Sequence, residues 1–253
     1  MEKRLRCATG IEGLDNILNG GIPIGNSVLV AGACGSGKTT LSMEFLVNGA
    51  KLGDTCMFIS VTEPVSKLVE NLKSFNFFDP KLIAERKLNL FDLGSIYERL
   101  GIEKKGYTIS NVEPIVNAIE DITKKLNAKR LVIDSITAVC HQLENRTRIR
   151  ELIFNLGRVL SALKCTTLMT SEVQPTGSWG GLPGVMYSVY GIEEAIADGI
   201  ILLGTIERKG YMLRTLHVVK MRGTTHSLAK YILDLTPNGV VLIPLLKWGA
   251  ESG

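Results

Sequence analysis

The stretch VLVAGACGSGKT at residues 28–39 joins an apolar run to the pattern G-x-x-x-x-G-K-T, and a helix-compatible segment follows from Thr40. Glycines let a backbone wrap around an anion with its N–H groups pointing inward, and the following helix adds the positive end of its dipole. Strand, loop and helix in this order predict a site for nucleotide phosphates. A glycine-rich turn that matches by chance is the alternative, and the flanking apolar run and helix argue against it.

The residue types in and beyond this loop also predict a metal site. Lys38 is expected to reach the β- and γ-phosphates, and Thr39 is expected to ligate Mg²⁺. A second acidic group, conventionally at the end of a hydrophobic strand, is needed to hold the metal through water. The apolar run 131–133 ends in Asp134, which supplies that group. An aspartate can also simply cap a strand, but the upstream phosphate loop favours the metal-binding interpretation.

Composition limits the class of protein. With 253 residues and 45% hydrophobic content, the chain suits one large α/β domain over residues 1–253. The balance of 29 basic against 25 acidic residues gives a net charge of +4, too small by itself to argue for nucleic acid. The five cysteines form no C-x-x-C pair, as expected for reduced thiols in the cytoplasm. Neither a signal peptide nor an 18-residue apolar run is present, so we expect no membrane insertion.

Apolar periodicity predicts alternating strands and helices, and therefore a mostly parallel twisted sheet flanked by helices on both faces. TGIE at 9–12 is typical of a capping box that opens a short helix. The strands expected in the parallel part are 28–30, 55–62, 88–93, 130–133, 166–170 and 200–203. The helices expected between them are 40–52, 64–74, 113–126 and 148–163. Strands expected at 211–220, 230–235 and 240–244, with a hairpin turn at 237–239, predict an antiparallel C-terminal edge.

Several further motifs resemble the KaiC family of RecA-like ATPases. They are TGIEGLD at 9–15, GGIPIG at 20–25, VIDS at 132–135, GIEEAIAD at 191–198 and KMRGTTH at 220–226. Most P-loop proteins lack the last two, and the resemblance covers nearly the whole chain. It implies a RecA-like P-loop NTPase core, ATP bound between neighbouring subunits and often a hexameric ring. Clock KaiC has two such domains in tandem, and this chain has room for one.

The resemblance also assigns residues. By motif, the phosphates would be contacted by Gly35, Ser36, Gly37, Lys38, Thr39 and Thr40. The residues that would reach a nucleotide held by the adjacent subunit are Lys220, Met221, Arg222, Thr224 and His226. Lys220 and Arg222 would then act as fingers in trans, because they stabilise charge on the γ-phosphoryl group only when the ring is assembled. Alternatively, the two cations simply alternate outward on a solvated strand end.

Two departures from the family pattern concern activity. The family usually ends its second strand with two adjacent glutamates, the first of which orients the attacking water, whereas this chain has Thr62 and Glu63 there. Successive strand residues face opposite ways, so Glu63 can act as the base only if the backbone has left strand geometry, which Pro64 permits. Otherwise Glu63 is a helix-terminal charge without chemistry, and both interpretations stay open. The clock protein's phosphorylated Ser-Thr pair falls on Glu194-Ala195 here, which disfavours autokinase activity.

Three hypotheses follow. The first is an ATP-binding regulatory protein that hydrolyses ATP slowly with Mg²⁺, assembles as a homo-oligomer, expected to be a hexamer, and acts on an unidentified protein partner. The second is a non-hydrolysing ATP-binding assembly module similar to FlaH, favoured by Thr62. The third is a DNA recombination or helicase accessory, which the fold permits. The glycine-rich segment 173–190 disfavours it because that segment holds no Lys or Arg. The spacing of Arg146, Arg148 and Arg150 favours a solvated helix surface.

Overall fold

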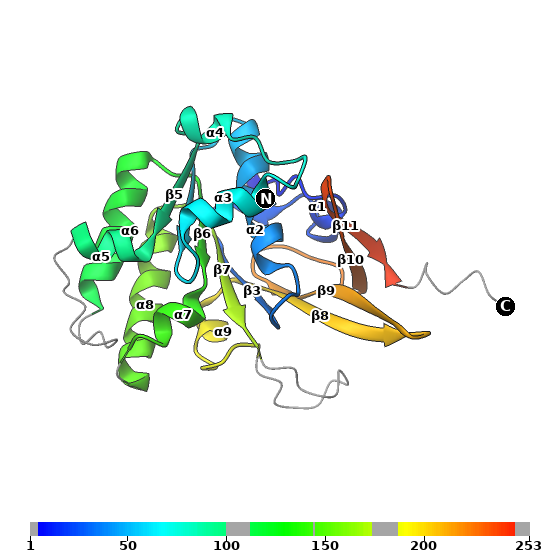
Figure 1. Cartoon of the computed structure of the whole chain (residues 1–253). Helices are drawn as coiled ribbons and strands as arrows, with labels where there is room; N and C mark the ends of the chain where they lie inside the picture. Colours follow the sequence, from blue (N-terminus) through cyan, green and yellow to red (C-terminus); the bar gives the residue numbers. More distant parts are fainter. Residues whose placement is uncertain (1–4, 100–111, 144, 174–186, 246–253) are drawn as a thin grey trace.

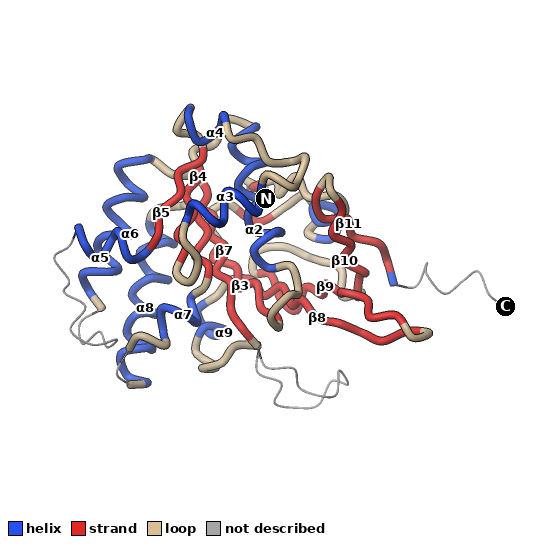
Figure 2. The backbone as a smooth tube through the Cα atoms, viewed as in Figure 1, coloured by secondary structure: helices blue, strands red, loops and turns tan. Residues whose placement is uncertain are grey.

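A nine-stranded sheet crosses the molecule, with helices packed against both of its faces (Figures 1 and 2). The computed structural model describes residues 5–99, 112–143, 145–173 and 187–245. The strands are β1 (Arg6–Cys7), β2 (Ile22–Pro23), β3 (Ser27–Gly32), β4 (Cys56–Ser60), β5 (Leu88–Asp92), β6 (Arg130–Asp134), β7 (Thr166–Glu172), β8 (Gly199–Arg208), β9 (Tyr211–Met221), β10 (Lys230–Thr236) and β11 (Gly239–Pro244). The helices are α1 (Leu14–Ile17), α2 (Lys38–Lys51), α3 (Val65–Leu72), α4 (Lys81–Ala84), α5 (Leu93–Arg99), α6 (Glu113–Leu126), α7 (Ile136–Cys140), α8 (Arg146–Ala162) and α9 (Glu193–Ile196).

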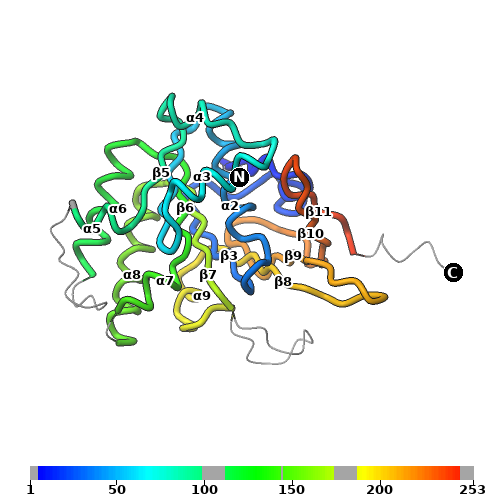
Figure 3. The backbone as a smooth tube through the Cα atoms, in the orientation of Figure 1, coloured from blue at the N-terminus to red at the C-terminus, as the bar shows by residue number. Residues whose placement is uncertain are grey.

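The sheet has a parallel core and an antiparallel edge. Its strand order is β11-β10-β9-β8-β3-β7-β6-β4-β5, while β1 and β2 form a separate pair. The strands from β8 to β5 in this order pair in parallel, and β9, β10 and β11 are added antiparallel. β3 lies between β7 and β8, which come much later in the chain (Figure 3). The predicted α/β fold, a mostly parallel sheet with antiparallel C-terminal strands, is confirmed.

Both faces of the parallel core are apolar because strand side chains alternate. In β3, Val28 and Val30 enter a cluster that includes buried residues of α2, whereas Leu29 and Ala31 enter a second cluster beneath α6 and α8. All four side chains are fully buried. β3, the strand that leads into the predicted phosphate loop, is therefore packed on both faces.

Several element boundaries differ from the predictions. β8 extends to Arg208 because it pairs with β9 across a tight turn at Lys209-Gly210, where both residues have positive φ of 50° and 79°. The short helices α4, α5, α7 and α9 were not predicted, since four to seven residues span too little of a helical period to be recognised.

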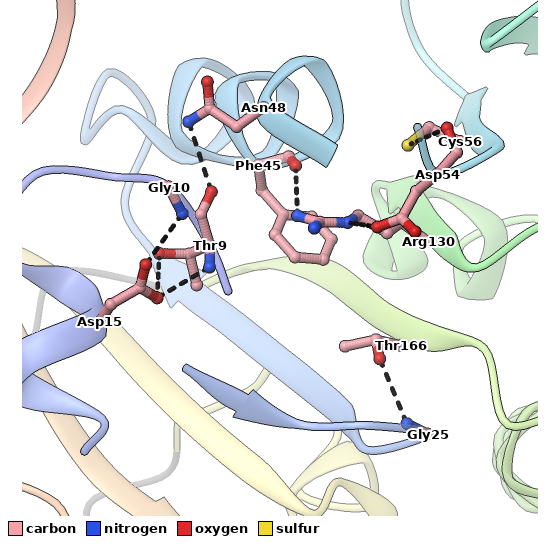
Figure 4. A network of polar contacts seen from close by, with 10 residues as sticks. All are labelled: Thr9, Gly10, Asp15, Gly25, Phe45, Asn48, Asp54, Cys56, Arg130 and Thr166. Carbon is pink, nitrogen blue, oxygen red and sulfur yellow. Dashed lines mark hydrogen bonds and ion pairs between the residues drawn. The ribbon is translucent and has the colours of Figure 1, made fainter. Parts of the chain in front are cut away.

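The expected capping box at residues 9–12 was wrong. α1 begins only at Leu14, and Thr9 does not cap it. Instead the Asp15 carboxylate accepts hydrogen bonds from the Thr9 N–H at 2.7 Å, the Thr9 hydroxyl at 2.8 Å and the Gly10 N–H at 3.0 Å (Figure 4). A charged carboxylate is a stronger acceptor than a neutral hydroxyl, so it organises this turn in place of the box.

A buried arginine of β6 anchors α2 to the sheet. Arg130 is 2% exposed, and its Nε donates to Asp54 Oδ2 at 2.7 Å while its Nη1 donates to the Phe45 carbonyl at 3.0 Å (Figure 4). The guanidinium also lies 4.8 Å from the centre of the Phe45 ring. Position 49 must be glycine, because a Cβ there would lie 2.2 Å from Arg130 Nε. This contact set fixes the helix that begins at the phosphate loop.

Candidate functional site

The phosphate loop connects the end of β3 to the start of α2. Gly35 and Gly37 adopt φ angles of 75° and 99°, the left-handed region that residues with side chains rarely adopt. A Cβ on Gly32 would lie 2.7 Å from both the Leu203 carbonyl and the Ser36 hydroxyl. The loop therefore needs these glycines to keep its tight wrapped path.

A cavity of about 320 Å³ opens beside this loop, at the carboxyl ends of the parallel strands. Ligands of open α/β sheets bind outside this end of the strands. The cavity wall brings together loop residues, including Lys38 and Thr39, with Thr62, Glu63 and Asp134 from other elements. Three segments that are far apart in the sequence therefore meet at this cavity.

The loop contains polar groups suited to an anion. Lys38 Nζ donates to the Gly32 and Ala33 carbonyls at 2.8 and 2.9 Å. Burial lowers the pKa of Lys38, and the carboxylates of Glu172 and Asp134 oppose that shift. The Ser36 hydroxyl is buried and has no hydrogen-bond partner among the residues that the structure describes. A buried cation and an unpaired hydroxyl at the start of α2 fit the phosphates of a nucleotide.

Oxygen atoms beside the loop fit a magnesium ion. Thr39 Oγ1 donates to Asp134 Oδ2 at 2.7 Å, and Thr170 Oγ1 donates to Asp134 Oδ1 at 2.5 Å. Mg²⁺ prefers such hard oxygen ligands and is usually held by one or two carboxylates, waters and substrate phosphates. In the part of the chain that the structure describes, no group of three or more His, Cys, Asp or Glu side chains could hold a metal alone. The donor set thus fits a metal that is bound together with phosphates.

Glu63 lies where the chain has left the second core strand. β4 ends at Ser60, and Glu63 follows in a bend, so the alternation of strand side chains no longer excludes it from the cavity. Its carboxylate accepts a hydrogen bond from Asn71 Nδ2 at 3.0 Å and lies 3.6 Å from Lys67 Nζ. The geometry permits a base at the cavity, and it equally permits a carboxylate engaged by α3. Both interpretations therefore remain.

The second predicted residue set lies at the other end of the strands, where the parallel strands β3 and β8 begin. Met221, at the end of β9, pairs with Gly199, at the start of β8, and Gly199 pairs with Val28. The phosphate loop begins four residues further along β3, at Gly32. Four strand residues span about 13 Å. Lys220 and Arg222 therefore lie far from the phosphate loop of their own chain.

A β-bulge sets the direction of these side chains. Ile200 pairs with Lys220 and Ile201 pairs with Val218, which leaves Val219 as the extra residue. Lys220 thereby points toward α9, where its Nζ donates to the Glu194 carbonyl at 2.7 Å. Burial, and next the charge of Arg222, lowers the pKa of Lys220. Lys220 is therefore not the fully solvated strand-end cation of the alternative interpretation.

The other members of this set differ in exposure. The Arg222 side chain is 60% exposed, with one nitrogen 3.9 Å from an Asp198 oxygen. Met221 is 4% exposed and packs over Gly199, so its side chain is part of the core, and a contact with a neighbour's nucleotide stays a prediction. The Thr224 hydroxyl donates to the Thr225 carbonyl at 2.8 Å. His226 Nε2 is buried, and no hydrogen-bond partner for it lies within the described part of the chain.

Two polar residues near the phosphate loop were not predicted from the sequence. Arg214 on β9 donates from Nε to the Gly35 carbonyl at 3.1 Å. Thr170 contacts Asp134, as described above. Neither belongs to a motif, and only the pairing of distant strands brings them to the site. β7 contains several polar residues, so nothing in the sequence singled out Thr170.

Three further regions are the end of β7, the glycine-rich segment 173–190 and the arginines of α8. The Ser171 hydroxyl lies 3.0 Å from that of Thr137, which also accepts the Glu172 N–H at 3.1 Å. These bonds hold the end of β7 against α7. Most of the glycine-rich segment 173–190 lies outside the described residues. Arg148 pairs with Glu151 at 2.7 Å, as a solvated helix surface would allow.

Comparison with known proteins places this geometry in a family. The family model "ATPase: KaiC" matches residues 7–247. This chain belongs to the KaiC family of ATPases. The RecA-like resemblance predicted from the motifs is thus confirmed, and membership of this family implies nucleotide binding.

Individual relatives agree with the family. A UPF0273 protein of Thermotoga maritima is 35% identical over 94% of this chain and 96% of its own length. The circadian clock oscillator protein KaiC of Parathermosynechococcus lividus is 32% identical over 94% of this chain but only 42% of its own length. The crystal structure of a KaiC-like protein from Pyrococcus horikoshii matches with a TM-score of 0.80 and 34% identity, covering 95% of this chain and 99% of that one. This KaiC family member therefore spans less than half of the clock protein.

The helices of this KaiC family member can be compared with the length and apolar character of a membrane-spanning helix. Over the described residues, 5–99, 112–143, 145–173 and 187–245, none of them combines the length and apolar character needed to cross a bilayer.

Proposed function

We propose that this chain is an ATP-binding regulatory protein that hydrolyses ATP slowly with Mg²⁺ and assembles through nucleotide sites shared between subunits. In this proposal residues 1–253 form one domain, and the assembly is a cytoplasmic homo-hexamer that acts on a protein partner. Lys38 and Thr39 bind the phosphates, and Thr39 also binds the metal together with Asp134. Lys220 and Arg222 reach the nucleotide of the next subunit.

The position of the two cations carries the proposal. Lys220 and Arg222 lie at the amino ends of the parallel strands, about 13 Å along the strands from the phosphate loop, so they are too far away to serve the nucleotide of their own chain. Head-to-tail packing of copies would bring these strand ends against a neighbour's loop, and such heterologous contacts form a ring when the rotation between copies closes. Charge on the γ-phosphoryl group would then be stabilised only after assembly. Nucleotide binding and assembly would be linked for this reason.

In this mechanism each residue has a distinct task. Lys38 exchanges its two carbonyl contacts for phosphate oxygens, and Ser36 gains a partner. Mg²⁺, when bound, neutralises phosphate charge, and Thr39 and Asp134 would hold it. Glu63 orients the attacking water if it releases Asn71 and Lys67. Arg222, the more exposed of the two cations, is the one free to move toward a neighbour.

A non-hydrolysing ATP-binding assembly module is the second candidate. The observation that favours it is at the base position, where Thr62 cannot accept a proton at neutral pH. The Glu63 carboxylate is held by Asn71 at 3.0 Å and lies near Lys67. In that case nucleotide binding itself is the output.

Steady-state ATPase activity with Mg²⁺, measured over a series of protein concentrations, separates the two candidates. Turnover per chain that rises with concentration and is abolished by Glu63→Gln supports slow hydrolysis in an assembly. Tight ATP binding without turnover in either protein supports the non-hydrolysing module. Lys38→Ala is the control, because it should abolish ATP binding in both cases. Failure of the unmodified protein to bind ATP would refute both candidates.

A further inference from the structure

We propose that Thr170 is a positioning residue that orients the Asp134 carboxylate for Mg²⁺. The proposal rests on the proposed function, since it deepens the metal site of the same nucleotide pocket. Its basis is the pair of hydrogen bonds that divides the two carboxylate oxygens between Thr39 and Thr170.

The geometry assigns each oxygen of Asp134 a different task. Oδ2 accepts a hydrogen bond from Thr39 Oγ1 at 2.7 Å, and Oδ1 accepts one from Thr170 Oγ1 at 2.5 Å. Thr170 thereby occupies the oxygen that Thr39 does not contact. Rotation of the carboxylate would break this bond, so the hydroxyl holds Oδ2 toward Thr39 and the metal.

Packing alone does not require a hydroxyl at this position. Thr170 is fully buried, and it pairs with Val30 on the neighbouring strand. On the same face of β7 the preceding position is Leu168, a member of the apolar cluster. Valine has nearly the shape of threonine and would suit these surroundings. A buried hydroxyl is costly unless it is hydrogen-bonded, and Asp134 supplies that bond.

The strand that carries Thr170 is held in place from its other face. The next residue, Ser171, contacts the Thr137 hydroxyl of α7 at 3.0 Å, and that hydroxyl also accepts the Glu172 N–H at 3.1 Å. Because strand side chains alternate, these contacts lie opposite Thr170. They join the end of β7 to α7, which follows Asp134 in the chain, while parallel pairing with β6 sets the register of β7.

Partners of this kind have a measurable effect on metal sites. Groups that hydrogen-bond to a metal ligand orient it, and their loss typically lowers metal affinity about 10- to 100-fold. We therefore expect Thr170→Val to weaken metal binding about 10-fold or more. Thr170→Ser keeps the hydroxyl and should restore the affinity to within about threefold of the unmodified protein.

The test measures Mn²⁺, a paramagnetic substitute for Mg²⁺, by the electron paramagnetic resonance signal of the free ion. Full-length protein is titrated in the presence of a non-hydrolysable ATP analogue, so no turnover is involved. Thr167→Val is the matched control, because Thr167 is also fully buried on β7 but its hydroxyl donates to the Cys165 carbonyl at 3.2 Å. It should leave Mn²⁺ affinity unchanged. If Thr170→Val does not fold, Thr170→Ala takes its place.

The outcomes are distinct. Mn²⁺ affinity that follows the hydroxyl, lost in Thr170→Val and retained in Thr170→Ser and Thr167→Val, supports the positioning role. Normal binding of the analogue with unchanged Mn²⁺ affinity in Thr170→Val overturns this inference and leaves the proposed function intact. Failure of the unmodified protein to bind the analogue overturns the proposed function itself.

Discussion

A buried carboxylate on the helix of the phosphate loop predicts an unusual dependence of stability on pH. Glu44 is 5% exposed, and its Oε2 accepts the Val240 N–H at 2.7 Å, which joins α2 to β11. Burial is the main cause that raises the pKa of Glu44 from 4.5 to about 7, and the nearby Glu12 adds to it. The Val240 N–H and the charge of Lys51 act in the opposite direction.

The sign follows from proton binding. Between pH 4.5 and about 7 the folded protein retains the Glu44 proton that the unfolded chain has already lost. The free energy of unfolding therefore falls as pH rises through this window, and the loss is complete above it. At about 1.4 kcal/mol per unit, the full effect is about 3 kcal/mol.

Glu44→Gln tests this directly, because the amide has no charge to lose and its oxygen can still accept the Val240 N–H. Urea denaturation of both proteins at several values between pH 4.5 and 8 gives the difference in unfolding free energy. All other titrating groups cancel in that difference. We expect the free energy of unfolding of the variant to increase relative to that of the unmodified protein as pH rises, by about 1 to 3 kcal/mol in total. A difference that is constant across the range would refute the reasoning.

Two further predictions concern the trans site and the anchor of α2. Arg222→Ala should lower turnover of the assembled protein at least about tenfold, while ATP binding to the isolated chain stays unchanged, since Arg222 lies at the strand ends opposite the phosphate loop; wild-type turnover at high protein concentration would contradict this. Gly49→Ala should lower the free energy of unfolding by about 2 to 3 kcal/mol, because the new Cβ would lie 2.2 Å from the buried Arg130 Nε. Denaturant titration measures it, and a stabilised variant, as expected for an ordinary glycine inside a helix, would count against the packing described here.

Short-range patterns carried much of the prediction. The strand, loop and helix of residues 28–51 are recognisable because each element depends on neighbours within a few residues. Asp134 was found in the same way, as the acidic end of an apolar run. The capping box at Thr9 was wrong because Asp15, six residues away, is a stronger acceptor than the Thr9 hydroxyl and takes the hydrogen bonds of this turn.

By itself, the sequence determined the phosphate loop, the parallel core with its antiparallel edge, and membership of the KaiC family. Only the tertiary structure decided how distant residues meet. Thr39 and Asp134 are 95 residues apart, and the order of the core strands brings them within 2.7 Å. The bulge at Val219 turns Lys220 toward α9, against the simple alternation expected of a strand. Such contacts depend on strand order and register, which local propensity does not encode, because one shifted residue reverses which face a side chain occupies.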